Sequence, residues 1–295
     1  MTDFIQNLIN GLQLGSIYAL VALGYTMVYG IVKLINFAHG DIIMVGAYVA
    51  LMSIHSFLRQ TGLPLWLCVI VSIFFCAILG MAIEFIAYKP LRNAPKLCSI
   101  ITAIGMSLLL QNLALLLQGA NPKPFVKIFP TDSFSIGGIQ TSFNTLLTIG
   151  VSLGLMAFMQ AFVQKSKMGR AMRCVSEDMG AARLMGINVN LTITVTFAIG
   201  SALAAVGSVF YSNTYPIVEP MMGSMLGLKA FIAAVLGGIG SIPGAIIGGL
   251  IMGVVETLAK GQISQWAEAI VFGILILVLL FKPSGILGKN IKEKV

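Results

Sequence analysis

The sequence predicts an all-α, polytopic helical membrane protein with about nine spans, and three observations lead to this fold class. Of the 295 residues, 58% are hydrophobic and only 9% are charged, whereas soluble domains carry about 25% charged residues. Several uncharged runs exceed the roughly 20 apolar residues that a helix needs to cross a bilayer. Helices also satisfy their own backbone hydrogen bonds in lipid, without the closed sheet that strands would require.

Each predicted span is an apolar run bounded by charged or turn-forming residues. Single helices are expected over about 8–31, 41–58, 65–88, 98–118, 141–164, 191–211 and 266–282. Residues 226–260 are expected to form two short helices, because Pro243 lacks a backbone N–H and lies among glycines. The residues of this break, assigned to helix packing or to a hinge, are Gly237, Gly238, Gly240, Pro243, Gly244 and Gly248. Glycines four residues apart let helix backbones approach closely in lipid.

The basic residues predict the orientation of the chain, since cytoplasmic loops carry an excess of Lys and Arg. With two short helices, 13 of the 18 basic residues fall on the side that holds loops 89–97 and 165–190. With one long helix the split weakens to 10 against 8. We therefore expect nine spans, with the N-terminus outside and the C-terminus cytoplasmic. The net charge of +8 then follows from basic loops, and no nucleic acid partner is expected.

Loop 165–190 has a helical pattern of its own. Its apolar residues recur at three- and four-residue spacing on one face: Met168, Met172, Val175, Met179 and Ala182. The pattern predicts a short surface helix over about 177–185, with Ser176 as its N-cap. Glu177 and Asp178 suit the positive end of the helix dipole, and Gly186 can end the helix.

This helix has two possible surroundings, lipid headgroups or a groove in another protein. Anionic lipid attracts a purely basic face most strongly, whereas this polar face carries acids as well as bases. Its centre is also small, with Gly180, Ala181 and Ala182 in succession. Both features favour docking into a protein groove.

The stretch NFAHGD (36–41) is a polar interruption between the first two spans. One alternative is a tight cytoplasmic turn, in which Gly40 provides the bend and Asp41 lies near the positive end of the next helix. The other is unwound backbone along a translocation path, which membranes tolerate where it lines a cavity. The residues assigned to this path are Asn36, Phe37, His39, Gly40 and Asp41.

Catalytic and nucleotide-binding patterns are missing from the sequence. There is no G-x-x-x-x-G-K-[ST] phosphate loop, and two His and four Cys residues follow no catalytic or metal-ligand spacing, so neither a cofactor nor an intramembrane enzyme is expected. Four charges lie near span ends, where they can snorkel or pair: Glu84, Lys229, Glu256 and Glu268. The lack of acids at mid-membrane is our argument against a stand-alone secondary amino-acid carrier, the alternative function.

Several segments carry a resemblance to a known family. EDMGAARLMG (177–186) resembles the segment of bacterial ABC import permeases that contacts the ATPase, although the Glu is separated differently from the Ala pair. GLQLGSIYALVALGYTMVYGIVKLINFAHGD (11–41), TAIGMS (102–107), GLKAFIAAVLGGIGSIPGAIIGGLIMGVVE (227–256) and ILVLLFKPSGILG (276–288) are similar to the LivH-type permease subunits of the branched-chain amino-acid ABC importer.

The resemblance implies one permease domain, 1–295, with 165–190 as its cytoplasmic coupling loop. It also implies a multi-pass protein of the bacterial cytoplasmic (inner) membrane that works by alternating access. The implied partners are a homologous second permease, two ATP-binding cassette subunits, an extracytoplasmic amino-acid-binding protein and membrane lipid. The positions that it assigns to ATPase coupling are Ser176, Glu177, Asp178, Gly180, Ala181, Ala182 and Gly186.

Overall fold

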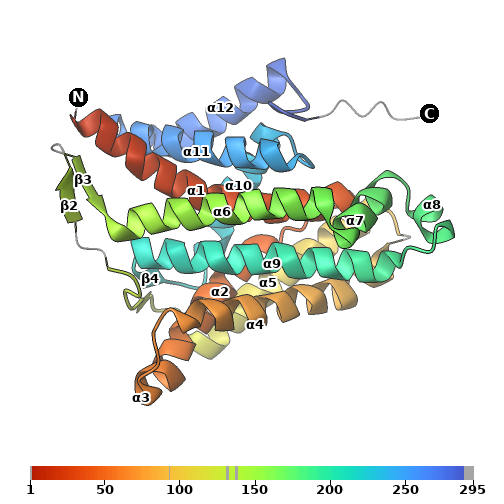
Figure 1. Cartoon of the computed structure of the whole chain (residues 1–295), viewed down its shortest axis with the longest axis horizontal. Helices are drawn as coiled ribbons and strands as arrows, with labels where there is room; N and C mark the ends of the chain where they lie inside the picture. The colour runs from red at the N-terminus through yellow and green to blue at the C-terminus, as the bar shows by residue number, and fades with distance from the viewer. Residues whose placement is uncertain (1, 93, 131–132, 137–138, 289–295) are drawn as a thin grey trace.

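The computed structural model describes residues 2–92, 94–130, 133–136 and 139–288, which form a bundle of helices (Figure 1). The helices are α1 (Thr2–Val32), α2 (His39–Ser53), α3 (Arg59–Thr61), α4 (Leu67–Ile83), α5 (Lys96–Gln118), α6 (Phe143–Lys165), α7 (Lys167–Glu177), α8 (Met179–Leu184), α9 (Val189–Thr214), α10 (Met222–Gly237), α11 (Ile242–Gln262) and α12 (Ala267–Phe281). Within these described ranges, eight helices are long and apolar enough to cross a membrane, and α10 is a shorter apolar helix. The predicted fold class is confirmed.

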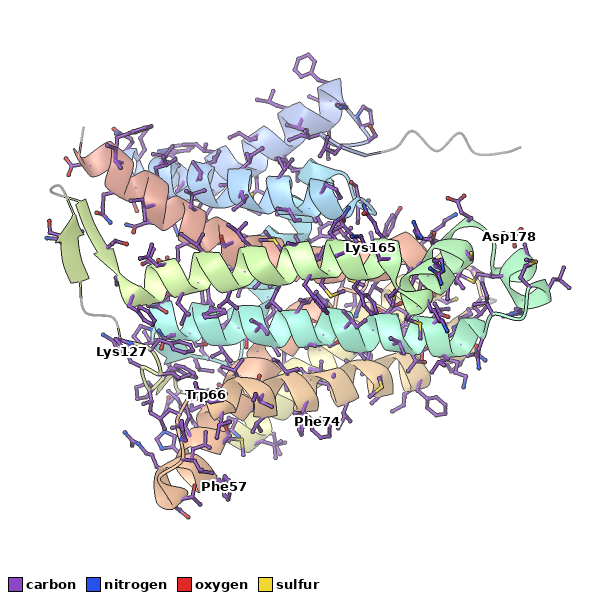
Figure 2. The ribbon with its side chains drawn as sticks, in the orientation of Figure 1. Phe57, Trp66, Phe74, Lys127, Lys165 and Asp178 are labelled. Atoms are coloured by element: carbon purple, nitrogen blue, oxygen red, sulfur yellow. The ribbon has the colours of Figure 1, made fainter. Side chains whose placement is uncertain are left out.

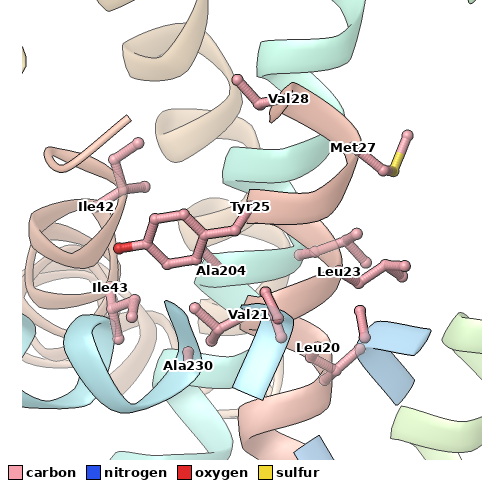
Figure 3. Close-up of a cluster of buried hydrophobic side chains, with 14 of the residues drawn as sticks. Leu20, Val21, Leu23, Tyr25, Met27, Val28, Ile42, Ile43, Ala204 and Ala230 are labelled. Atoms are coloured by element: carbon pink, nitrogen blue, oxygen red, sulfur yellow. The ribbon is translucent and has the colours of Figure 1, made fainter. Parts of the chain in front are cut away.

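The helix α1 lies at the centre of the bundle because it is apolar on nearly every side. It packs against α6, α9, α10 and α11. Figure 3 shows its side chains, among them Leu20 and Tyr25, beside Ile42 of α2 and Ala230 of α10. Glycines bring α1 and α11 together, since a Cβ atom added at Gly253 would lie 2.1 Å from the backbone nitrogen of Gly15.

The helices at the periphery expose large apolar side chains. In the most apolar 18-residue stretch of α5, only 17% is buried, and in that of the segment that contains α12, only 11% is buried. Phe57, Trp66 and Phe74 project from the segment that contains α2, α3 and α4 (Figure 2). Apolar surface on this scale fits contact with lipid or with another membrane subunit.

Two short two-stranded sheets, one of them a hairpin, were not predicted from the sequence. β1 (Lys123–Pro124) pairs antiparallel with β4 (Ile217–Val218), and β2 (Ser133–Ile136) pairs antiparallel with β3 (Ile139–Ser142). They lie at the end of the bundle near the N-terminus, opposite the end that holds α7 and α8 (Figure 1). They therefore form part of the surface at one end of the bundle and leave the spans all-helical.

The predicted break between α10 and α11 is present, but only one of the two helices is short. α10 has 16 residues, whereas α11 has 21 and is long enough to cross a membrane. Gly238 and Gly240 have φ values of 106° and 92°, so both occupy the left-handed region that glycine tolerates. A Cβ atom at Gly237 would lie 1.9 Å from the carbonyl oxygen of Gly244. This break is therefore a close turn between two packed helices.

Candidate functional site: the coupling segment and the polar interior

The loop 165–190, which was predicted to contain an amphipathic helix, lies at one end of the bundle, beyond Lys165 (Figure 2). The Ser166 hydroxyl accepts the backbone N–H of Gly169 at 2.8 Å and so caps α7. Met172 and Val175 are each 1% exposed, and α7 packs against α1, α6 and α9. The predicted apolar face is confirmed, and it anchors the segment to the central helices.

The short helix predicted over about 177–185 is present as α8, but it begins at Met179, and the prediction that Ser176 is its N-cap is wrong. α7 continues through Glu177, and Asp178 then adopts an extended conformation before α8 begins. One carboxylate oxygen of Asp178 accepts the backbone N–H groups of Gly180 at 2.7 Å and Ala181 at 3.0 Å. The Ser176 hydroxyl instead donates to the carbonyl of Arg173 at 2.7 Å. Because Ser176 lies within α7, Asp178 is the N-cap of α8.

The capping bonds stabilise the ionised form of Asp178. Hydrogen bonds from the backbone N–H groups of Ala181 and Gly180 lower the pKa of this carboxyl below its usual value. Glu177, Gly180 and Ala181 are exposed, whereas Ala182 is 3% exposed. The cap therefore presents an exposed, negatively charged turn at the start of α8.

The end of α8 carries the most exposed apolar residues of the segment, to which no role was assigned from the sequence. Leu184 is 91% exposed and Met185 is 81% exposed. Gly186 has a φ of 78° and ends the helix, as predicted. Two adjacent apolar residues directly before a helix-ending glycine were the signal in the sequence. Their exposure gives this end of the bundle a small apolar knob.

All of residues 36–41 except Phe37 are buried in the interior of the bundle. Tyr88 donates its hydroxyl to the side-chain oxygen of Asn36 at 2.9 Å. The rings of His39 and Tyr25 meet edge to face with centroids 4.5 Å apart. Phe37 is 38% exposed, whereas Asn36 and His39 are buried.

Of the roles expected for Gly40 and Asp41, that of Gly40 is wrong and the position of Asp41 is confirmed. α2 begins at His39, and the residue with a left-handed φ, 54°, is Lys33, so the expectation that Gly40 provides the bend is wrong. Gly40 is a contact residue, because a Cβ atom there would lie 2.6 Å from the carbonyl oxygen of Gly223 in α10. Asp41 lies in the first turn of α2, as predicted. Its carboxylate accepts a hydrogen bond from Gln111 of α5 at 2.9 Å. The role of these residues in a translocation path stays a prediction.

The charges near span ends pair with one another. Glu84 forms an ion pair with Arg92, and Lys229 pairs with Glu256 at 2.8 Å and with Glu268 at 3.3 Å. Pairing was predicted, but Glu84 and Glu256 are both 0% exposed and therefore do not snorkel. The expected lack of acids at mid-membrane, which was the reason given against a secondary carrier, stays a prediction.

Comparison with known protein families shows to which family the chain belongs. The family model described as "Branched-chain amino acid transport system / permease component" matches residues 7–280. The chain belongs to this family. The match spans almost the whole permease, from the first turns of α1 to the end of α12, and includes both the segment 165–190 and the α10–α11 break.

Relatives of this permease match along its full length. The high-affinity branched-chain amino acid transport system permease protein BraD of Pseudomonas aeruginosa is 44% identical over 302 residues, which cover 99% of this chain and 98% of BraD. The corresponding LivH proteins of Salmonella typhimurium and Escherichia coli K12 are 43% and 42% identical, with the same coverage. The chain is thus a multi-pass membrane permease component, as the LivH-type resemblance predicted.

Proposed function

We propose that this permease is the transmembrane subunit of an ATP-driven importer of leucine, isoleucine and valine in the bacterial cytoplasmic (inner) membrane. The observation that carries the proposal is the end-to-end similarity to permease proteins of high-affinity branched-chain amino acid transport systems. In this proposal residues 1–295 belong to a single permease domain, with 165–190 as its cytoplasmic coupling loop.

The proposed partners follow from what one permease subunit cannot supply. The sequence contains no phosphate-binding loop, so two ATP-binding cassette subunits hydrolyse ATP for the complex. A homologous second permease and membrane lipid cover the exposed apolar surface of the peripheral helices. An extracytoplasmic amino-acid-binding protein delivers the substrate at the end of the bundle opposite α7 and α8.

The coupling segment is the proposed docking site for an ATP-binding cassette subunit. Its exposed turn, formed by Glu177, Asp178, Gly180 and Ala181, has small residues and a negative charge that suit a groove on a partner. Leu184 and Met185 add an apolar knob that the partner buries. Ser176 and Gly186 delimit this surface, and Ala182 holds α8 to the bundle.

The proposed mechanism is alternating access driven through α7. Closure of the ATPase dimer displaces α8, and α7 transmits the displacement because Met172 and Val175 are buried against the bundle. A cavity of about 90 Å³ separates Met172 and Ser176 of α7 from Gly240 and Ile242 of the α10–α11 break. Movement of α7 therefore changes the shape of a cavity that is also lined by Gly240, one of the glycines proposed as a hinge. The ATPase shifts the conformational equilibrium through contacts that differ between the two states.

Purification of the complex in mild detergent tests this function. We expect an ATPase and a second permease to co-purify, and reconstituted vesicles with the binding protein to take up leucine only when ATP is supplied. Substitution of Leu184 and Met185 by Ser is expected to release the ATPase, whereas Thr61→Ser, an exposed substitution at the other end of the bundle, retains it. Leucine transport by the chain alone, without ATP, would instead establish the secondary carrier.

A further inference from the structure

A charged cavity opens at the surface of the bundle, away from the coupling loop 165–190, and its lining includes exposed residues such as Ile217 and Met221. Its volume is about 500 Å³, within the range of small-molecule sites in proteins. Leu14 and Tyr18 of α1 line it, whereas Thr26 and Ile31 line the smaller cavity beside α7. At about 1.5 Å per residue, Leu14 and Thr26 are separated by about 18 Å along α1. The charged cavity therefore lies toward the end that the binding protein would face.

One wall of this cavity is a network of ionised side chains. The carboxylate of Glu256 is buried and accepts from Lys229 at 2.8 Å, from Lys260 at 2.7 Å and from the hydroxyl of Tyr18 at 2.7 Å. Lys229 also lies 3.3 Å from Glu268. Glu256 is thus fully partnered, while the charges around it retain free hydrogen-bonding groups.

These free groups are of both signs. An ammonium has three N–H donors, and Lys229 donates one of them to Glu256 and lies 3.3 Å from Glu268. The side chain of Lys260 is 47% exposed and that of Glu268 is 53% exposed, so both remain accessible at the cavity. Glu219 adds another carboxylate to the lining. One wall therefore offers cationic donors and anionic acceptors within reach of one small molecule.

The remaining walls are apolar and adaptable. They are formed by Leu14, Ile217, Met221, Met222, Met225 and Leu226. Methionine side chains are flexible and accommodate apolar groups of differing shape. One wall of the cavity thus carries charges of both signs, and the others are apolar and flexible. This combination is complementary to an amino acid with an aliphatic side chain.

A purely structural role explains the network less well. A clamp between α10 and α11 needs a single ion pair, and buried ion pairs contribute little net stability compared with apolar residues of the same volume. Ionisable residues inside membrane-spanning bundles mark substrate pathways. Five charged side chains here line one cavity, rather than being distributed along the helix contacts.

We propose that this cavity is a transit site for the zwitterionic head group of an aliphatic amino acid. Lys229 and Lys260 receive its carboxylate, Glu268 receives its ammonium group, and Met225 and Leu226 contact its side chain. This proposal rests on the proposed function, because it takes the transported substrate as its ligand. It places substrate contacts on α10, α11 and α12, where the sequence analysis expected none.

Photolabelling of the complete reconstituted transporter tests the site directly. ATP-driven leucine uptake is measured first, and its absence would contradict the proposed function itself. The same preparation is then illuminated with a diazirine analogue of leucine. We expect labelling of the segment from Met221 to Leu226, with protection by leucine but not by 4-methylpentanoate or 3-methylbutylamine, which each lack one charge. Active uptake with labelling elsewhere, or equal protection by either singly charged analogue, would overturn this site alone.

Charge variants supply a second test, because substrate contact and a purely structural role of the charged residues predict different results. Glu268→Gln is expected to lower leucine uptake about ten-fold or more, as loss of one charge-assisted hydrogen bond predicts. It should also let 4-methylpentanoate compete with leucine for labelling, because the ammonium contact is lost. Asp3→Asn, which removes an exposed acid outside the cavity, is the matched control. It should change neither leucine uptake nor competition by 4-methylpentanoate. Unchanged uptake and unchanged competition in Glu268→Gln would overturn the assignment.

Discussion

The ammonium of Lys229 lies 2.8 Å from the carboxylate of Glu256, so α10 and α11 are joined by an ion pair inside the bundle. The two residues are 27 positions apart in the chain, and the α10–α11 turn brings them to the same level. Glu256 is also held by Lys260 and Tyr18. Removal of one partner therefore affects the others.

The first prediction concerns this pair. Glu256→Leu should lower the free energy of unfolding by about 3–5 kcal/mol, because it leaves Lys229 buried with only half-exposed Glu268 as a partner. The double variant Lys229→Met/Glu256→Leu should be closer to wild type, since no unpaired buried charge remains. Thermal unfolding of the purified permease compares wild type, Lys229→Met, Glu256→Leu and the double variant. A double variant as unstable as the sum of the two single variants would contradict this interpretation.

The second prediction concerns the cap of α8. Asp178→Ala removes the acceptor of two backbone N–H groups and should reduce ATP-driven uptake, whereas Asp178→Asn retains a capping oxygen and should preserve it. Amide hydrogen exchange at Gly180 and Ala181 measures the loss of the cap. Fast exchange in both variants would show that the carboxylate charge, not the cap geometry, protects these amides.

The cap also makes α8 sensitive to acid. The pKa of Asp178 is lower in the folded protein than in the unfolded chain, because Ala181 and Gly180 donate to the carboxylate. Its stabilising contribution is therefore complete above the unfolded value of about 3.9 and is lost as the pH falls through the lower folded-state pKa. Exchange at Gly180 in wild type should become faster over that acidic range, relative to its intrinsic rate. In Asp178→Asn this relative rate should not change with pH.

The third prediction concerns the contact between α2 and α10. Gly40→Ala should destabilise the protein by about 1–3 kcal/mol, because the added Cβ atom would lie 2.6 Å from the carbonyl oxygen of Gly223. Gly105→Ala in α5 is the matched control, since no heavy atom lies within 4 Å of its added Cβ. It should be neutral or stabilising by up to about 1 kcal/mol. Equal melting temperatures for the two variants would contradict the close contact.

The fourth prediction separates coupling from assembly. Gly180→Leu enlarges the exposed turn and Ala182→Leu lifts α8 from the bundle, because Ala182 is buried. Both should uncouple ATP hydrolysis from leucine uptake while leaving the permease in the membrane. The ratio of transported leucine to hydrolysed ATP measures the effect. Normal uptake by both variants would reject 177–186 as the coupling segment.

The fifth prediction uses native cysteines to test the orientation. Cys98 and Cys174 are exposed, whereas Cys68 and Cys76 are buried. With the N-terminus outside, a membrane-impermeant thiol reagent should modify Cys98 and Cys174 only from the cytoplasmic side. A Gln140→Cys variant, with the cysteine in β3 at the other end of the bundle, should react from outside. Labelling of Cys174 from outside would reverse the predicted orientation.

The sequence alone determined the helical spans, the α10–α11 break and the amphipathic face of α7. These features follow from local properties: the length of an apolar run against bilayer thickness, the lost N–H of Pro243, and a 3.6-residue period. The full-length motifs also identified the family. The sequence did not identify the N-cap of α8, because Ser176 and Asp178 are both good capping residues. The position at which α7 ends makes Asp178 the cap.

Only the tertiary structure decided which residues meet. The contact of Gly40 with Gly223, the pairing of Lys229 with Glu256 and the charged cavity all depend on the relative positions of helices distant in the chain. A sequence shows that Glu256 lies in a span, but whether it snorkels or is buried depends on which helix faces it. The physical reason is that hydropathy acts residue by residue, whereas burial and ion pairing are properties of packed neighbours.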